Sequence, residues 1–326
     1  MKNNKAALNA AASVTGAVIL LAVLSGLAGC EAPLNMEAVE VAREQPIHRT
    51  DRYQAVARSD SNVVIVGNQG VILYSSDNGV SWQRNELPDW PALIDVAACP
   101  NGSFVALAFA PLVFLSSDGG ATWMSRPIPT TESPQALTCA PDNKIWVVGA
   151  FTNRWASGDA GESWVESTND EDVLLTTVQF FDGNNGVITG EFGTVMFTTD
   201  GGKNWETMAP LVEEFYPQTA HFKNPLEGWV AGLGGVILYT SDGGKNWTSQ
   251  DTETVVPLYG IAEIGSTIYA VGGEGTVLRY EGDLWRIFNH GKPIRLYIRA
   301  IEALDDARAI IAGVRGTLHI IDTGGA

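Results

Sequence analysis

The sequence predicts an all-β protein, a β-propeller of seven four-stranded blades, and two observations support this prediction. The motif [S/T]-x-D-x-G-x-[S/T/N]-W occurs five times, and its tryptophans recur at intervals of 41 or 42 residues. Each copy follows short runs rich in β-branched and aromatic residues, such as residues 63–67 and 71–74, which indicate strands joined by a turn. A period near forty residues with four short strands per unit is typical of a propeller blade.

The repeated motif is expected to be structural. Its aspartate can accept backbone N–H bonds within a turn, its glycine permits a positive φ, and its tryptophan can pack between sheets. A catalytic group is rarely needed five times around a ring, so the motif positions are not candidate catalytic residues. These positions are Asp77, Trp82, Asp118, Trp123, Asp159, Trp164, Asp200, Trp205, Asp242 and Trp247.

Two further units complete the predicted ring. Residues 268–280 and 309–321 repeat the strand pair without the full motif, and the printed sequence stops at Ala326 before an outer strand of the last unit. We expect residues 37–49 to supply that strand, because closure of this kind removes exposed sheet edges. The predicted propeller spans residues 50–326.

The first thirty residues predict a lipoprotein signal peptide. Lys2 and Lys5 precede an uncharged apolar stretch, and Leu27-Ala28-Gly29-Cys30 resembles the lipobox in which the cysteine receives a diacylglycerol. The alternative is an uncleaved membrane anchor. We therefore expect a signal peptide at 1–29, lipidation at Cys30, a linker at 30–49, and a location on the periplasmic side of the outer membrane.

Composition narrows the classes of partner. The formal net charge of −17 makes nucleic acid an improbable ligand and leaves the lipid on Cys30 as the expected membrane attachment. Apart from Cys30, the chain has Cys99 and Cys139, which leaves a disulfide and two buried free thiols as open alternatives.

Residues 224–247 contain the pattern G-W-V-x-G-x-x-G-x-I-L-x-x-S-D-G-G-x-x-W, which resembles the bacterial-neuraminidase or Asp-box repeat. More narrowly, it resembles the photosystem II stability and assembly factor family, and the similarity covers about residues 50–322. The resemblance implies a propeller that binds and helps to assemble membrane or envelope protein complexes. In a phototroph its client would be a photosystem II intermediate.

The alternative function is a sialidase-like glycoside hydrolase or a carbohydrate-binding propeller. A sialidase would need an arginine cluster and an Arg-Ile-Pro-like motif, where this chain has only Gln45-Pro46-Ile47-His48-Arg49. The four histidines lack metal-ligand spacing, and the glycine-rich strings do not open a helix as phosphate loops do. We expect no catalytic residue, metal or cofactor.

The face opposite the repeated motif is the predicted partner surface. The turn between the second and third strands and the linker between blades lie at the same end of each blade, and these segments carry aromatic and arginine residues that are common in interfaces. Packing of these loops against one another, and surface ion pairs of the arginines, are the alternative explanations. The candidate partner-binding residues are Trp90, Phe192, Phe215, Tyr216, Arg295, Tyr297, Arg299 and Arg315.

Overall fold

The computed structural model describes residues 36–208, 215–291 and 293–324. These residues form two compact units, which divide after Glu44. The first unit contains the helix α2 (Glu37–Glu44). The predicted signal peptide and Cys30 lie outside the described residues. Within the described ranges, no helix is long and apolar enough to cross a membrane.

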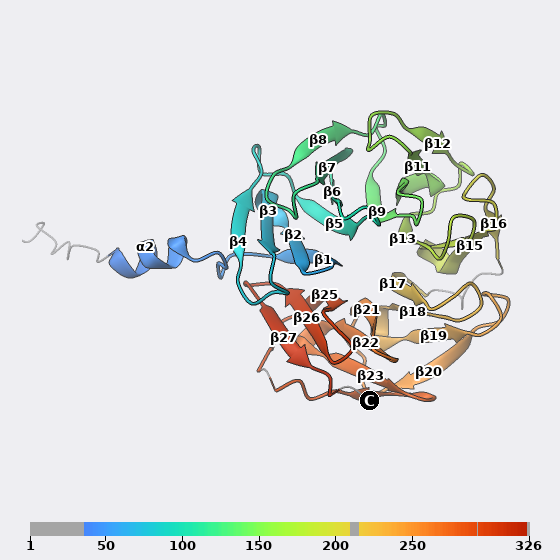
Figure 1. The fold of residues 1–326 in the computed structure, drawn as a ribbon. Coiled ribbons are helices and arrows are strands. Elements are labelled where there is room, and N and C mark those ends of the chain that lie inside the picture. The colour runs from blue at the N-terminus through green and yellow to red at the C-terminus, as the bar shows by residue number, and fades with distance from the viewer. Residues whose placement is uncertain (1–35, 209–214, 292, 325–326) are drawn as a thin grey trace, which may run out of the picture. The chain divides into compact units, whose positions relative to one another are not determined.

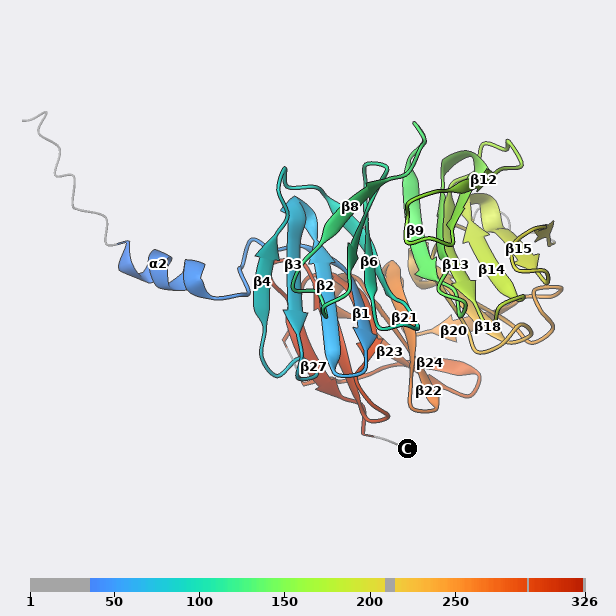
Figure 2. The same ribbon diagram turned by 45° about the horizontal axis from the view of Figure 1, so that its top comes forward.

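The second unit is a ring of antiparallel blades, with the first strand of each blade nearest the centre (Figure 1). Figure 2 shows β4, β3, β2 and β1 of the first blade side by side. Blades 1 and 2 are β1 (Tyr53–Ser59), β2 (Asn62–Gly67), β3 (Val71–Ser75), β4 (Gln83–Glu86), β5 (Leu93–Ala98), β6 (Phe104–Ala108), β7 (Leu112–Ser116) and β8 (Met124–Pro127). Blades 3 and 4 are β9 (Pro134–Cys139), β10 (Ile145–Gly149), β11 (Arg154–Ser157), β12 (Val165–Ser167), β13 (Leu175–Phe180), β14 (Gly186–Gly190), β15 (Thr194–Thr198) and β16 (Glu206–Thr207).

The remaining blades follow the same strand order. Blades 5 and 6 share one sheet, because their outer strands β20 and β24 pair in parallel. These two blades and the seventh are β17 (Pro217–Phe222), β18 (Gly228–Gly232), β19 (Ile237–Thr240), β20 (Thr248–Thr252), β21 (Leu258–Ile264), β22 (Thr267–Gly272), β23 (Val277–Glu281), β24 (Leu284–Ile287), β25 (Ile298–Ala303), β26 (Arg308–Gly313) and β27 (Leu318–Asp322). The described chain thus has the predicted all-β, seven-bladed architecture.

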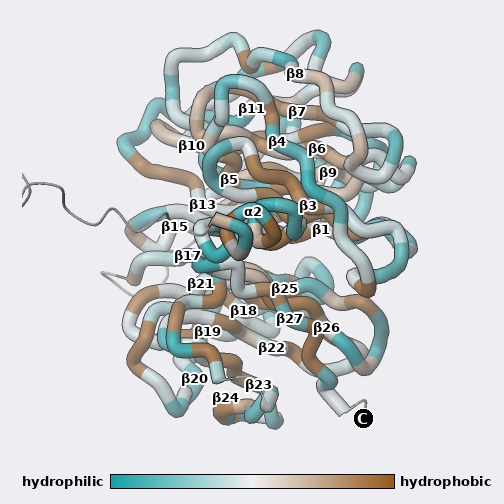
Figure 3. The backbone as a smooth tube through the Cα atoms, turned by 90° about the vertical axis from the view of Figure 1, so that its left-hand side faces the viewer, coloured by the Kyte–Doolittle hydropathy of each residue, from teal (hydrophilic) through white to brown (hydrophobic). Residues whose placement is uncertain are grey.

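The hydrophobic core lies between neighbouring blades. The second strands are almost continuously apolar and buried on both faces, as in β2 and β6. Figure 3 shows these hydrophobic stretches inside the blades and more hydrophilic turns at the periphery. Each Asp-box tryptophan is half-buried against the preceding blade: Trp123, for example, packs on the cluster of blades 1 and 2. Buried apolar surface of this kind supplies most of the stabilisation of the ring.

The Asp boxes form the predicted turns. Asp77 accepts hydrogen bonds from the Ser75 hydroxyl at 2.7 Å and from the Ser81 backbone N–H at 2.9 Å. These bonds, with one from the Ser81 hydroxyl, lower the pKa of Asp77 to about 2. The same bonding recurs in the other four boxes. The carboxylates therefore stay ionised and stabilise the turns in which they lie.

The prediction that residues 37–49 supply a closing strand is wrong. Residues 37–44 are helical, and in the described chain the seventh blade has only β25, β26 and β27. Two sequence features explain the difference. The helix has Glu37 and Glu40 in its first turn and Arg43 in its last, which suits the helix dipole. Pro46 follows and has no N–H to donate to a neighbouring strand.

The ring closes instead through an irregular segment, residues 45–52. The N–H of Gly316 donates to the carbonyl of Asp51 at 3.0 Å, just as Gly70 donates to Pro91 between the first two blades. An isolated bridge joins Arg52 to Val314, and the first blade packs on the seventh through Tyr53, Ala300 and their neighbours. The compact unit accordingly begins at Gln45 rather than at residue 50.

Candidate functional site

The turns between the second and third strands project from one end of the blades, which we call the loop face. In blades 1, 3, 4, 5 and 6 these turns are η1 (Asn68–Gly70), η2 (Ala150–Thr152), η3 (Glu191–Gly193), η4 (Leu233–Gly235) and η5 (Gly273–Gly275). The middle residue of each has a positive φ. This conformation costs roughly 1–2 kcal/mol for a residue with a Cβ.

Phenylalanine occupies this strained position in two neighbouring blades. Phe151 has φ 55° and Phe192 has φ 56°, whereas the equivalent residue of blade 5 is Gly234. Both rings are exposed, at 44% and 68% of their surface. A glycine would fit the turn without strain, so the turn itself does not explain the aromatic side chain. Strained, exposed residues of this kind are candidates for a functional role.

Two more aromatic residues extend the exposed surface. Trp90, in the linker between blades 1 and 2, is 71% exposed, and Phe109, at the start of the corresponding turn of blade 2, is also exposed. Backbone bonds place both at the loop face: Gly70 donates to Pro91, and Phe109 donates to Ala92. We call Trp90, Phe109, Phe151 and Phe192 the aromatic series, and its members come from blades 1 to 4.

The predicted partner-binding residues differ in their surroundings. Trp90, Phe192, Arg295, Tyr297 and Arg315 are exposed as predicted. Phe215 is not: it is only 7% exposed and packs in the core between blades 4 and 5, so its prediction as a surface anchor is wrong. Tyr216 is half-buried and donates from its hydroxyl to Glu191 Oε1 at 2.6 Å. Burial and this carboxylate raise the pKa of Tyr216 to about 12.

Arg299 lines a cavity at the centre of the ring. The cavity has a volume of about 510 Å³. It is formed largely by a bulge that recurs near the start of every first strand, where one residue is left without a partner on the second strand. These seven bulge residues, which all line the cavity, are Gln54, Ile94, Gln135, Thr176, Gln218, Tyr259 and Arg299.

Arg299 and Asp95, two side chains of opposite charge, both line the cavity, and burial disfavours the charged form of each. The Arg299 guanidinium lies over the Tyr259 ring, 5.2 Å from its centroid, and burial lowers the pKa of Arg299. Asp95 accepts from the backbone N–H groups of Val96 at 2.9 Å and Leu137 at 2.8 Å. Burial outweighs these bonds and raises the pKa of Asp95 to about 6.

The sequence reasoning missed Phe109, Phe151 and Asp95. The first two could have been found by aligning the residues that follow each second strand, because Phe192 was recognised at the same place in blade 4. No sequence pattern marks Asp95 as a cavity residue, because its position depends on the bulge between Leu93 and Asp95 in β5. In the described ranges no cluster of His, Cys, Asp or Glu has the geometry to hold a metal ion.

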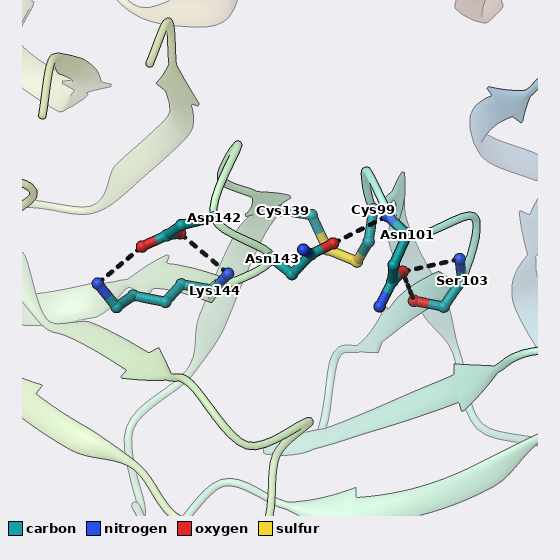
Figure 4. Close-up of a disulfide and its surroundings, with 7 residues drawn as sticks. All are labelled: Cys99, Asn101, Ser103, Cys139, Asp142, Asn143 and Lys144. Atoms are coloured by element: carbon teal, nitrogen blue, oxygen red, sulfur yellow. Dashed lines mark hydrogen bonds and ion pairs between the residues drawn. A yellow bond between two sulfur atoms is a disulfide. The ribbon is translucent and has the colours of Figure 1, made fainter. Parts of the chain in front are cut away.

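Cys99 and Cys139 form a disulfide between blades 2 and 3 (Figure 4). Their Cα atoms are 5.0 Å apart, within the usual range for such a bond. A second link lies beside it, where the Asn101 N–H donates to Asn143 Oδ1 at 2.9 Å. The structure thus selects the disulfide from the two alternatives that the sequence left open.

Comparisons with known proteins agree with this fold. Residues 169–264 match the family model described as "Photosynthesis system II assembly factor YCF48". YCF48 from Cyanidioschyzon merolae superposes with a TM-score of 0.70 at 15% identity, covering 84% of this chain and 96% of that one. YCF48 bound to D1 peptide gives 0.69 at 17% identity, covering 86% and 93%.

A lyase has a similar fold. Virginiamycin B lyase from Staphylococcus aureus superposes with a TM-score of 0.73 at 15% identity, covering 84% of this chain and 95% of that one. A search of curated proteins found no match to this sequence. At these identities the solved structures establish the fold alone, and they confirm the predicted β-propeller.

Proposed function

We propose that this protein is a lipid-anchored scaffold whose loop face binds a membrane or envelope protein and assists its assembly. The proposal depends mainly on one observation: Phe151 and Phe192 hold exposed aromatic rings in left-handed turns of adjacent blades. Gln69 and Glu274 hold the same left-handed φ in other blades, so the feature particular to these two turns is the exposed aromatic ring. Exposed aromatic residues commonly anchor protein interfaces.

The sequence match supports a YCF48-like role. The matched segment, residues 169–264, includes Phe192 and its turn. One YCF48 structure was solved with D1 peptide bound, which makes polypeptide binding a property of that propeller. We infer that the present chain also binds a polypeptide client, and that the aromatic series contacts an apolar part of it.

The proposed role is non-enzymatic. The five Asp-box carboxylates are hydrogen-bonded within their own turns and are poor proton donors, because these bonds lower their pKa values. The lyase similarity concerns the fold, and folds are shared by proteins of unrelated function.

The proposed location is the periplasmic side of the outer membrane, with attachment through Cys30. The Cys99–Cys139 disulfide supports an oxidising compartment such as the periplasm. Cys30→Ser should remove the lipid and shift the protein from the detergent phase to the aqueous phase on phase partitioning. Unchanged partitioning of the variant would contradict lipidation at Cys30.

Capture of membrane proteins tests the scaffold role. The full-length protein and the Phe151→Ala/Phe192→Ala variant would each be used to capture partners from solubilised membranes, with quantification by mass spectrometry. We expect the variant to recover at least tenfold less of a client than the wild type does, since interface anchors contribute about 2 kcal/mol or more to binding.

Val80→Ala is the matched control for this capture. Val80 is as exposed as Phe192 but lies in an Asp-box turn, at the opposite end of the strands. It should retain the client, as should Lys203→Glu and Lys245→Glu in two other Asp boxes. Equal recovery by the double phenylalanine variant and the wild type would overturn the proposed binding face.

A further inference from the structure

The guanidinium of Arg299 has no acceptor in the described chain. It forms no hydrogen bond or ion pair with any residue of 36–208, 215–291 or 293–324, and its close neighbour is the Tyr259 ring. Asp95 attracts the Arg299 charge from a distance, but no ion pair within 4 Å joins the two side chains. Arg299 is partly exposed to the cavity, so its five donors are available to water or to an anion that enters the cavity.

The rest of the cavity wall offers neutral polar groups. Among the described residues, the side chains of Gln135, Gln218 and Thr219 have no hydrogen-bond partner, and all three line the cavity. Their amides and hydroxyl can both donate and accept, which suits a ligand with several hydroxyl groups. The Tyr259 ring adds an aromatic surface on the same wall.

Charge and size restrict the ligand further. Arg299 is the one charged group among the seven bulge residues, and Asp95 lines the same cavity. A phosphate or a polycarboxylate would therefore place more negative charge beside Asp95 than one arginine offsets. The volume of about 510 Å³ falls within the range of small-molecule sites, roughly 300–1,000 Å³.

We propose that the central cavity binds a small hydroxylated monocarboxylic acid, with its carboxylate on Arg299 and its hydroxyl groups on Gln135, Gln218 and Thr219. Arginine suits this role because its planar fork matches a carboxylate in two parallel hydrogen bonds. The cavity shares Phe109 with the aromatic series, but the proposed contacts to Arg299, Gln135, Gln218 and Thr219 do not depend on the scaffold function.

Isothermal titration calorimetry of the full chain with D-galacturonate and D-galactose tests this proposal. The two sugars share a ring and differ in a carboxylate against a hydroxymethyl group. We expect galacturonate to bind and galactose to bind at least tenfold more weakly, because only galacturonate can form charged hydrogen bonds with the guanidinium. Equal binding of both sugars, or no heat from galacturonate at millimolar concentrations, would overturn the proposal.

Two variants locate the carboxylate. Arg299→Gln should abolish the preference for galacturonate, while Arg299→Lys should retain part of it, since lysine keeps the charge without the fork. Arg295→Gln, at an exposed arginine of the same blade, should bind as the wild type does. Thermal melting of each variant would verify folding. Full galacturonate binding by a folded Arg299→Gln variant would contradict the assignment, whatever the outcome at the loop face.

Discussion

Arg84 donates to Asp51 from both terminal nitrogens, from Nη1 to Oδ2 at 2.9 Å and from Nη2 to Oδ1 at 3.1 Å. Asp51 is buried and also accepts from the Tyr53 hydroxyl and the His48 N–H. Through these bonds it fixes the segment that joins the first blade to the seventh. The ring is therefore closed by this irregular segment, in which the Asp51 carbonyl and Arg52 pair with Gly316 and Val314, and not by the expected fourth strand.

Asp51→Ala should lower the free energy of unfolding by about 3–5 kcal/mol, because it leaves the Arg84 charge without its buried partner. Urea denaturation measures this change. Glu86→Ala is the control, since Glu86 pairs with Arg84 from an exposed position and should contribute less than about 1 kcal/mol. Equal effects of the two substitutions would show that Asp51 does not hold the ring closed.

The disulfide should stabilise the propeller measurably. Cys99 and Cys139 are separated by 40 residues, and cross-links closing loops of this size typically contribute about 2–4 kcal/mol. Cys99→Ser/Cys139→Ser should lower the free energy of unfolding by that amount when both proteins are measured without reductant. Adding reductant should destabilise the wild type and leave the double variant unchanged. A reductant-insensitive wild type would exclude the bond.

The free energy of unfolding should fall as the pH rises from mildly acidic to mildly alkaline values. Burial raises the pKa of Glu302 from its ordinary value of 4.5 to about 7, with Arg58 acting weakly in the opposite direction. The folded state therefore holds this proton more tightly than the unfolded chain. Stability from Glu302 is present below pH 4.5 and is lost as the pH rises through about 7. Asp95, with a pKa of about 6, acts in the same direction.

Glu302→Gln should reduce this loss, because glutamine remains neutral across the range. Urea unfolding of the variant and the wild type at about pH 5 and about pH 8 measures the difference. The exposed Glu162→Gln substitution should leave the pH profile unchanged. A steeper fall in Glu302→Gln than in the wild type would contradict the assignment.

At strongly acidic pH, protonation of the Asp-box carboxylates should determine how stability changes with pH. Hydrogen bonds from Ser81, Ser163 and Asn204 lower the pKa values of Asp77, Asp159 and Asp200 to about 2. Their contribution is present above the ordinary aspartate value of 3.8 and is lost as the pH falls through about 2. The wild type should thus be most stable at mildly acidic pH, between the two transitions, as followed by thermal melting. Highest stability at alkaline pH would contradict this balance.

The blades could be predicted from the sequence because their signals are local. Asp77 and Trp82 lie five residues apart in one turn, and the same spacing recurs at a fixed period. The ring closure was predicted wrongly, although residues 37–44 carry signals against a strand. Apolar and polar residues do not alternate strictly in this segment, and Pro46 lacks the N–H that a paired strand would donate.

The candidate site was predicted only in part because exposure depends on the neighbouring blade. Phe192 and Phe215 are both aromatic residues near strand ends, yet the first projects from a turn and the second packs between blades. Arg299 was recognised as basic, but its place in the cavity follows from a bulge in β25. No local pattern in the sequence marks that bulge.

Site-specific photo-crosslinking in the native membrane tests the role of the loop face most directly. A photoreactive amino acid would replace Phe192 in one variant and Val80 in another, two exposed positions at opposite ends of the strands. The scaffold account predicts a discrete crosslinked protein from position 192 and none from position 80. A crosslinked partner from position 80, with none from position 192, would contradict it.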